Sequence, residues 1–316
     1  MSALPSLPLA PETLDRDYLR RDDPLLFDQL WAEPATRVLA VHKGKVLLHA
    51  DSTAATGLLS LLPVDQVPSA QFRVYLGKTL IAQGEEPAGT QVVLAVLSDN
   101  AANQLQPDAD AWRDLRRAGF GLSDRDANLY AVALAVTNFH DSHRHCHSCG
   151  QPTVIEQGGW SRRCFADNRQ VFPRTDPAII VAVTDSEDRI LLGSQGVWEH
   201  NRWSILAGFV EAGESLTAAV AREVYEEAGI RVGQVHYLGS QAWPFPYSLM
   251  VGFEAKLAED QLADGITPDG DEIVKLQWFT RDQILDGHRT GSMIMPGPLS
   301  IARAIIEHWL GGALHE

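Results

Sequence analysis

Three glutamates at helical spacing are the residues of this chain best suited to hold a metal ion. Glu223, Glu226 and Glu227 lie in the segment 216–228, which contains no Gly or Pro and follows a potential N-cap, Ser215. Positions i, i+3 and i+4 share one face of a helix, so the three carboxylates would crowd together. A hard divalent ion relieves such crowding, and Mg²⁺ also bridges phosphate oxygens. The spacing therefore predicts metal-assisted chemistry at phosphate.

The residues around these glutamates complete a longer pattern. Gly208, Gly213 and Glu214 form a loop that enters the helix, and Gly229 stops the helix. Arg222 is expected to orient Glu214 or one of the helix carboxylates through a bidentate pair. The segment 208–230 reads G-x5-E-x7-R-E-U-x-E-E-x-G-U, where U is a bulky aliphatic residue. A solvated acidic helix face is the alternative interpretation, and the complete spaced pattern argues against it.

The composition is that of an ordinary globular protein and excludes some partners. The 316 residues suit two domains with a small module between them. Apolar residues make up 45% and charged residues 21% of the chain. With 26 Lys and Arg against 41 Asp and Glu, the net charge is −15, so general attraction to nucleic acid or anionic membrane is not expected. An acidic enzyme can still bind anions locally through metal ions and a few arginines.

The sequence predicts a cytoplasmic protein. No run approaches the 18 apolar residues of a membrane-spanning helix. The N-terminal residues lack the basic region and apolar core of a signal peptide, and their acidic side chains argue against a transit peptide. The C-terminal tripeptide is no targeting signal that we recognise. Three cysteines, two of them in a C-x2-C pair, fit a reducing compartment better than a disulfide scaffold.

Apolar periodicity and turn residues predict a β-rich first part and a mixed second part. In the first part we expect strands at 37–41, 45–50, 72–76, 78–83 and 90–97, and helices at 109–118 and 127–141. In the second part we expect strands at 178–184, 189–193, 203–207, 235–241, 248–257 and 274–279, and helices at 281–285 and 298–310 besides the glutamate helix. The first 125 residues carry no chemical motif, and 119–121 is interpreted as a turn.

A cysteine-rich segment separates the two parts. Cys146 and Cys149, followed by Gly150, form a knuckle in which a tight turn offers two thiolates to one metal ion. Cys164 is a candidate third ligand. A four-cysteine ribbon would need a second cysteine pair here, but position 167 is Asp. Zinc accepts a carboxylate oxygen, although structural sites use it less often, so Asp167 is a candidate fourth ligand.

Two questions about this segment stay open in the sequence. A histidine beside the first knuckle could replace Asp167 as a ligand, the candidates being His143, His145 and His147. The segment could also be a zinc-free remnant held by packing around Trp160 and Phe165. In both cases the expected role is structural, because no open catalytic position is suggested.

A second unusual loop follows the glutamate helix. Residues 240–248 read SQAWPFPYS, so two prolines stiffen a loop that carries three aromatic rings, two hydroxyls and an amide. Such a surface can stack on a flat ring and donate hydrogen bonds to a ribose or a phosphate. The alternative interpretation is that Trp243 and Phe245 simply pack in the core.

These motifs resemble those of a known family. The segment from Gly208 is similar to the box of the Nudix hydrolase superfamily, and SQ-x-WPFP-x-S resembles the signature of its NADH pyrophosphatase branch, also known for removing NAD caps from RNA. The resemblance implies an α/β fold, with a β-rich N-terminal domain, a small zinc ribbon and a C-terminal Nudix α/β/α sandwich. We accordingly expect domains at 1–140, 141–175 and 176–316.

The resemblance covers the chain from about Ala127 onward by motif, and the earlier part by layout alone. The sequence departs from the family pattern at two positions. Ala242 replaces a usual Pro inside the signature, which we expect to be a mild change. Asp167 stands where the family has its fourth zinc cysteine, which puts the zinc in doubt rather than the chemistry.

By the same resemblance, Glu223 and Glu227 match the family's ligands for Mg²⁺ or Mn²⁺, with Glu226 beside them. The Ala207 carbonyl and Glu272 match further metal ligands. Phe172, which is Tyr in the family, and Phe209 match aromatic residues that flank the nicotinamide ring. Matching substrate contacts are Gln241, Ala242, Trp243, Pro244, Phe245, Pro246, Tyr247, Ser248 and Ala302. The family is a homodimer whose sites use both subunits, and we expect the same here.

The reaction that the resemblance implies is hydrolysis of the pyrophosphate of NADH to reduced nicotinamide mononucleotide and AMP, with Glu227 as the favoured base. Removal of NAD caps from RNA uses the same chemistry on a larger substrate. Hydrolysis of ADP-ribose or dinucleoside polyphosphates is an alternative, but it would not require the WPFP loop. A non-catalytic NAD(H) sensor is a further alternative; such proteins typically lose box glutamates, and all of them are present here.

Overall fold

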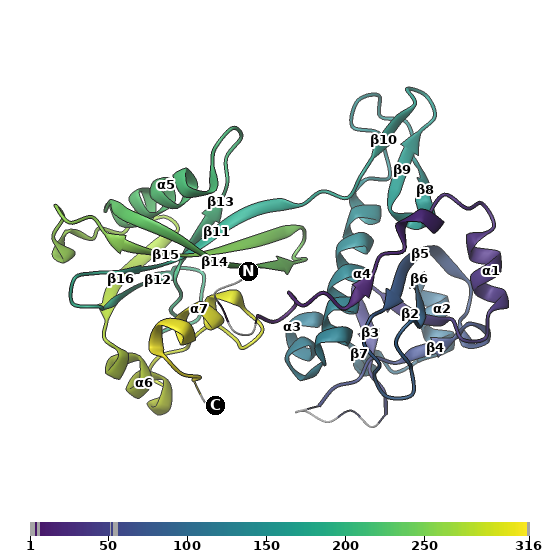
Figure 1. The fold of residues 1–316 in the computed structure, drawn as a ribbon, viewed down its shortest axis with the longest axis horizontal. Coiled ribbons are helices and arrows are strands. Elements are labelled where there is room, and N and C mark those ends of the chain that lie inside the picture. The colour runs from purple at the N-terminus through teal and green to yellow at the C-terminus, as the bar shows by residue number, and fades with distance from the viewer. Residues whose placement is uncertain (1–3, 5–6, 51, 53–55, 315–316) are drawn as a thin grey trace. The chain divides into compact units, whose positions relative to one another are not determined.

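The computed structural model describes residues 4, 7–50, 52 and 56–314, and the chain divides into two compact units (Figure 1). The C-terminal unit contains residues 1–8, 176–242 and 248–316, and the N-terminal unit contains residues 9–175 and 243–247. The expectation that neither end carries a targeting segment involves residues 1–3, 5, 6, 315 and 316, which lie outside the described residues. No helix in the described part of the chain is long and apolar enough to cross a membrane.

The N-terminal unit is built on a seven-stranded sheet with a buried centre. Along the sheet the strands are β1 (Leu14–Asp15), β5 (Ala70–Thr79), β6 (Gln91–Leu97), β2 (Arg37–His42), β3 (Lys45–Leu47) and β7 (Trp112–Arg113), and β4 (Leu61–Pro63) pairs with β2. Strands β2 and β6 pair in parallel and are aliphatic along most of their length, as expected for strands covered on both faces. The helices are α1 (Leu26–Ala32), α2 (Asp99–Leu105), α3 (Leu115–Ala118) and α4 (Asp124–Ser142).

Two expectations for this unit are wrong. The strands expected at 72–76 and 78–83 are a single strand, β5, because register shifts bend it without ending it. At Gly77 (φ 118°) a Cβ would lie 2.0 Å from the Asp15 carbonyl oxygen, so only glycine fits this bend. The helix expected at 109–118 is a 3₁₀ turn, then β7, then α3, because Trp112 is buried and the β7 backbone pairs with β3. Both errors arise from contacts that are distant in sequence.

Helix α4 is buried around most of its circumference because several elements pack against it, including β5, α3 and β1. The Ser123 hydroxyl caps its start and accepts from the Asp126 amide at 3.3 Å. Near its end, His140 contacts Phe72 of β5 edge to face at 4.8 Å, and its Nε2 donates to the Gly159 carbonyl at 2.8 Å. Burial lowers the pKa of His140 to about 4, so the ring is neutral and its Nδ1 accepts from Arg162 at 3.1 Å.

The element beyond α4 is the cysteine-rich module, a three-stranded antiparallel sheet of β8 (Val154–Glu156), β9 (Ser161–Cys164) and β10 (Arg169–Val171). The first knuckle turns at Gly150 (φ 73°), where its amide donates to the Cys146 carbonyl at 2.9 Å.

Short 3₁₀ turns of the chain lie at Tyr18–Arg20, Val64–Gln66, Ala109–Ala111, Gly119–Gly121, Gln157–Gly159 and Ala263–Gly265.

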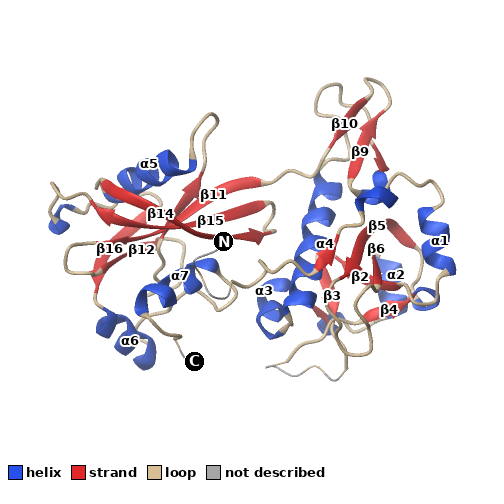
Figure 2. Cartoon of the chain, viewed as in Figure 1, coloured by secondary structure: helices blue, strands red, loops and turns tan. Residues whose placement is uncertain are grey.

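The C-terminal unit is a six-stranded mixed sheet with helices on both faces (Figure 2). Its strands are β14 (Val232–Trp243), β15 (Ser248–Leu257), β11 (Asp176–Thr184), β12 (Ile190–Gln195) and β16 (Ile273–Phe279) in sheet order, with β13 (Leu206–Phe209) paired to β11. Helix α5 (Leu216–Ala228) packs on one face, and α6 (Arg281–Thr290) and α7 (Ile301–Leu310) pack on the other. This is the predicted α/β/α sandwich.

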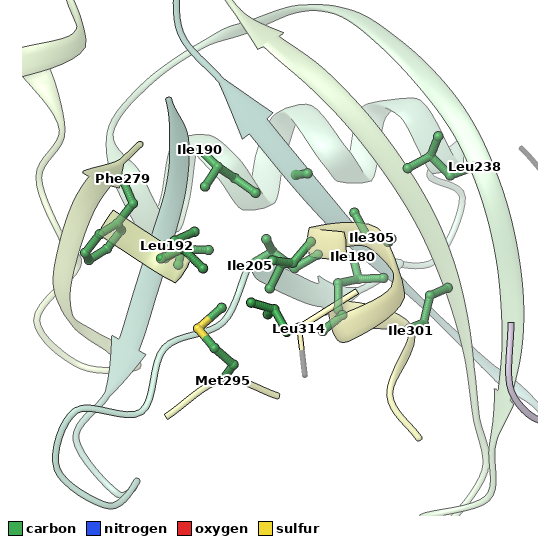
Figure 3. Packing of buried hydrophobic residues seen from close by; sticks show 14 of the residues in the cluster. Ile180, Ile190, Leu192, Ile205, Leu238, Phe279, Met295, Ile301, Ile305 and Leu314 are labelled. Carbon is green, nitrogen blue, oxygen red and sulfur yellow. The ribbon is translucent and has the colours of Figure 1, made fainter. Parts of the chain in front are cut away.

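Successive side chains of β11 pack alternately into the two cores of this sandwich. Ile179, Val181 and Val183 belong to the core under α5, whereas Ile180 and Ala182 belong to the core under α6 and α7. Figure 3 shows the second core, to which the sheet contributes Ile180 and Leu192 and α7 contributes Ile301 and Ile305. Because β11 is buried on both faces, it forms a rigid support for β13 and the segment that follows it.

Candidate active site and metal centre

The glutamate helix begins and ends where the sequence predicts. The Ser215 hydroxyl accepts from the Ala218 amide at 3.2 Å, and Gly229 closes the helix in the left-handed region (φ 69°). Helix α5 buries an aliphatic stripe that includes Val220 and Val224 against the sheet. The carboxylates of the box are thereby fixed to a helix that cannot rotate without exposing its core residues.

Arg222 gathers the carboxylates of the box. Its Nε and Nη2 donate to the two oxygens of Glu214 at 2.9 Å each, and its Nη1 donates to Glu223 at 2.9 Å and to Glu226 at 2.8 Å. A further bond from Nη2 reaches the Phe209 carbonyl at 2.9 Å. The sequence left open whether Arg222 orients Glu214 or a helix carboxylate, and the structure shows that it orients both. These bonds lower the pKa of Glu214, and they raise the pKa of Arg222.

Glu227 lies outside this network, and no Lys, Arg or His of the described residues forms an ion pair with it. Its side chain is 4% exposed, and its Oε2 is buried without a hydrogen-bond partner. Burial raises the pKa of Glu227 to about 8, and the neighbouring charges of Glu272, Glu223 and Asp269 add to the effect. A buried carboxylate oxygen that faces other carboxylates and lacks a donor fits the ligand set of a divalent cation.

Gly208 on β13 lets the chain approach the glutamate helix closely. A Cβ at this position would lie 2.0 to 2.3 Å from the carboxylate atoms of Glu223. The same strand contains Ala207, which pairs with Ile180 of β11. Burial is the largest cause of a raised pKa at Glu223, opposed by Arg222. The carboxylate of Glu223 thus lies between Arg222 and the backbone of β13, and position 208 has no room for a side chain.

Two acidic residues before β16 complete the surroundings of Glu227. Glu272, which the sequence analysis proposed as a metal ligand, accepts from the Gln195 amide at 3.0 Å. Asp269 was not predicted, and its carboxylate accepts from the amides of Asp271 and Ile273, at 3.1 and 2.8 Å. The run DGDE directly before a strand is the sequence signal that could have indicated it.

The predicted substrate residues fall into three groups. Phe172 and Phe209 are 58% and 59% exposed, so both rings have free faces. Residues 243–247, which we name the recognition loop, belong to the N-terminal unit, and Trp243 stacks edge to face on Phe245 at 5.0 Å. The flanking residues Ala242 and Ser248 are exposed and half-buried, respectively.

The third group has structural roles in this fold. Gln241 is 0% exposed, and its amide donates to the carbonyls of Pro8 and Leu299 at 2.6 and 2.9 Å while its oxygen accepts from the Ile301 amide at 2.9 Å. Its side chain therefore anchors the start of α7 and has no group left for a ligand. Ala302 is 3% exposed in the core beneath α7, so its side chain offers no free surface either.

The cysteine-rich module brings four ligand atoms together. One ligand atom from each of Cys146, Cys149, Cys164 and Asp167 lies within 4.8 Å of the other three. Cys146 Sγ is 3.4 Å from Asp167 Oδ2, and Cys149 Sγ is 3.5 Å from Cys164 Sγ. The alternative histidine ligands, His143, His145 and His147, are outside this cluster. Phe165 is 70% exposed and Trp160 half-buried, so Phe165 does not supply the packing of a zinc-free remnant.

Comparison with known proteins places these features in one family. Family models match three successive segments: an NADH pyrophosphatase-like rudimentary NUDIX domain at 35–138, an NADH pyrophosphatase zinc ribbon domain at 141–172, and a NUDIX domain at 174–294. The chain is 38% identical over 288 residues to the NAD-capped RNA hydrolase NudC of Mycobacterium tuberculosis, covering 87% of this chain and 86% of that protein. The chain belongs to the NADH pyrophosphatase and NAD-capped RNA hydrolase family of Nudix hydrolases.

Other relatives match over shorter stretches. The human NAD-capped RNA hydrolase NUDT12 is 36% identical over 201 residues, which is 60% of this chain and 43% of that protein. A solved NUDIX hydrolase from Nitrosomonas europaea covers 54% of this chain and 96% of its own, with 22% identity and a TM-score of 0.42. As a member of this family, the protein is a hydrolase that acts on pyrophosphate bonds.

Replacing Gly208 with Ala should impair catalysis more than folding. The added methyl group would displace the flexible carboxylate of Glu223, which can move at little cost to the fold. A ligand shifted by about 1 Å can slow an enzyme about 100-fold, so we expect a kcat loss of that order. Gly265→Ala is the matched control, because nothing lies within 4 Å of its added Cβ. Near-normal kcat for Gly208→Ala, with an unchanged melting temperature, would show that Glu223 does not need this position.

The stability of the protein without Mg²⁺ or Mn²⁺ should fall as the pH rises from about 4.5 to 8. In this window the folded state keeps a proton on Glu227, whose pKa is about 8, while the unfolded chain has lost it at 4.5. The stabilising contribution of this protonated carboxyl is therefore fully present below pH 4.5 and is lost as the pH approaches 8. Denaturant unfolding across this range should show a smaller decline for Glu227→Gln, and equal declines for both proteins would contradict the assignment.

Proposed function

We propose that this protein hydrolyses the pyrophosphate of NAD(H) to nicotinamide mononucleotide and AMP, and removes NAD caps from RNA by the same reaction. The buried, unpartnered Oε2 of Glu227 is the observation that carries the chemical part of the proposal. Family membership supports the choice of substrate, since the Mycobacterium tuberculosis and human relatives are both NAD-capped RNA hydrolases.

The glutamate cluster fits Mg²⁺ or Mn²⁺. The proposed ligands are the Ala207 carbonyl and the carboxylates of Glu223, Glu226, Glu227 and Glu272. When bound, such ions neutralise phosphate charge and lower the pKa of a water molecule. Glu227 is the proposed base, because its Oε2 is buried without a hydrogen-bond partner, whereas Glu214, Glu223 and Glu226 are bonded to Arg222. Arg222 and Glu214 are proposed to hold the glutamates in place.

Substrate binding is proposed for the exposed aromatic residues and the recognition loop. The rings of Phe172 and Phe209 are free to stack on nicotinamide or adenine. The remaining contacts are proposed for Ala242, Trp243, Pro244, Phe245, Pro246, Tyr247 and Ser248. Gln241 and Ala302 are buried, which supports a role in the packing that positions the site rather than side-chain contact with the substrate.

The zinc site is proposed to have three sulfur ligands and one oxygen ligand. The Asp167 carboxylate is already oriented, because its Oδ1 accepts from the Arg169 amide at 3.0 Å while its Oδ2 lies beside Cys146. Four convergent ligand atoms match the tetrahedral requirement of structural zinc. The site is closed by four protein ligands, which supports a structural role.

From the family resemblance we further propose a homodimer and domains at 1–140, 141–175 and 176–316. We also propose a cytoplasmic location. Three cysteines without a disulfide among them support a reducing compartment.

A product assay tests the proposed function. The purified protein is incubated with NADH, NAD, ADP-ribose or NAD-capped RNA, each with and without Mn²⁺, and the nucleotide products are separated. We expect nicotinamide mononucleotide and AMP from NAD(H), 5′-monophosphate RNA from the capped substrate, and at least about 100-fold lower kcat for Glu227→Gln. Cleavage of ADP-ribose without cleavage of NAD(H) or capped RNA would overturn the substrate assignment, and near-wild-type turnover by Glu227→Gln would refute the base.

Zinc retention tests the fourth ligand. Asp167→Ala should bind zinc at least about 10-fold more weakly than the wild type, and Asp167→Cys should bind it at least as tightly. Asp141→Ala is the control, because this exposed carboxylate pairs with Arg144. Zinc content after dialysis and the absorption spectrum of the cobalt-substituted protein are the readouts. Equal retention by Asp167→Ala and the wild type would exclude Asp167 as a ligand.

A further inference from the structure

The recognition loop cannot hold its own shape by backbone hydrogen bonds. Pro244 and Pro246 have no amide hydrogen, so the loop has few donors to satisfy its carbonyls. Within the loop, the bond from the Phe245 amide to the Trp243 carbonyl, at 2.7 Å, closes a single turn. The carbonyls of both prolines therefore depend on donors from elsewhere in the N-terminal unit.

Asn138 of α4 supplies those donors. Its Nδ2 donates to the Pro244 carbonyl at 3.1 Å and to the Pro246 carbonyl at 3.0 Å. An amide with two hydrogens is the neutral group that can serve two acceptors from one atom. Asparagine is also a poor residue for the interior of a helix, because its side chain competes for backbone bonds. Its presence in α4 is explained by the loop.

Ser142 makes a second contact one helical turn later. Positions 138 and 142 are i and i+4, so both side chains lie on the same face of α4. The Ser142 hydroxyl bonds to the hydroxyl of Tyr247, which also donates to the Asn138 carbonyl at 3.1 Å. Ser142 and Tyr247 thus fix the end of the loop, as Asn138 fixes its middle.

Two arginines and a histidine of the N-terminal unit contact the aromatic rings of the loop. The Arg116 guanidinium lies 4.3 Å from the ring centre of Phe245, and the Arg174 guanidinium lies 5.6 Å from that of Tyr247. On the α4 side, His143 meets Tyr247 edge to face at 6.4 Å. The rings are therefore set by α3, α4 and the segment after β10, all in the N-terminal unit.

We infer that Asn138 and Ser142 are positioning residues for substrate recognition, through which α4 sets the conformation of the loop that contacts the substrate. This inference rests on the proposed function of the loop. Neither residue is among the proposed ligands of the metal ions or the proposed substrate contacts, so each acts through substrate affinity rather than through the chemical step.

Steady-state kinetics with NADH test the inference. Loss of the two bonds in Asn138→Ala should raise the KM for NADH about tenfold, with a smaller change in kcat. Asn138→Asp, which keeps the size but removes the donors, should raise KM at least as much. Asn128→Ala is the matched control on the same helix, since Asn128 accepts from Thr13 and does not touch the loop; its KM should stay within about twofold of wild type.

A merely structural role for Asn138 predicts a different result. Partial unfolding lowers the concentration of active enzyme and hence the apparent kcat, but it leaves KM unchanged. An Asn138→Ala protein with wild-type KM would therefore overturn the inference. Hydrolysis of NADH by the wild type is measured first, so that failure of the proposed function is seen separately from failure of the positioning role.

Ser142 and Tyr247 provide a second test that does not depend on the folding of the Asn138 variants. Ser142→Ala and Tyr247→Phe should each raise the KM for NADH about threefold, because both remove the contact between the two hydroxyls, and Tyr247→Phe also removes the bond to the Asn138 carbonyl. The double variant should then be no worse than the more affected single variant. Additive effects, or no effect of Ser142→Ala, would show that this contact does not position the loop.

Discussion

Repulsion among the carboxylates of α5 is the constraint on which the rest of the active site depends. Arg222 donates four hydrogen bonds to the carboxylates of Glu214, Glu223 and Glu226 and a fifth to the Phe209 carbonyl, whereas Glu227 receives none of them. The protein thereby leaves one buried carboxylate uncompensated at the centre of an acidic cluster. Such an arrangement destabilises the fold without a cation, and the same free energy becomes affinity when a divalent cation is present.

The backbone around this cluster is arranged to keep the carboxylates fixed under that repulsion. Strand β11 is buried on both faces, and it carries β13, which presents Gly208 to Glu223 without an intervening side chain. Ser215 and Gly229 fix both ends of α5, and Val220 and Val224 fix its rotation. A charged cluster on a mobile loop would relax by separating its charges. On this scaffold Glu227 is buried, which is the main cause of its raised pKa, and the charges of the neighbouring carboxylates add to the effect.

What the sequence could predict follows from the range of the interactions involved. Helix α5 was predicted at its observed bounds because its cap, its stop and its apolar stripe are all local signals. The helix expected at 109–118 was wrong because pairing of β7 with β3 overrides local propensity. The family resemblance places Gln241 in the substrate-binding segment, but only the folded chain shows that its side chain bonds to the Leu299 carbonyl, which is remote in sequence. Asn138 was missed for the same reason: only the folded chain places it beside Pro244 and Pro246.

The net charge of −15 limits how a capped RNA could be recognised under the proposed function. General attraction to the phosphate backbone supplies most of the affinity in many nucleic-acid-binding proteins, and it is absent from a chain of this charge. Affinity must then come from contacts at the cap itself, namely stacking on aromatic rings and metal-assisted binding of the pyrophosphate. A recognition loop rigidly held by α4 suits that requirement, because a preformed surface loses less conformational entropy on binding a small group. Under the proposed function, the same contacts are available to free NAD(H), so one site would serve both substrates.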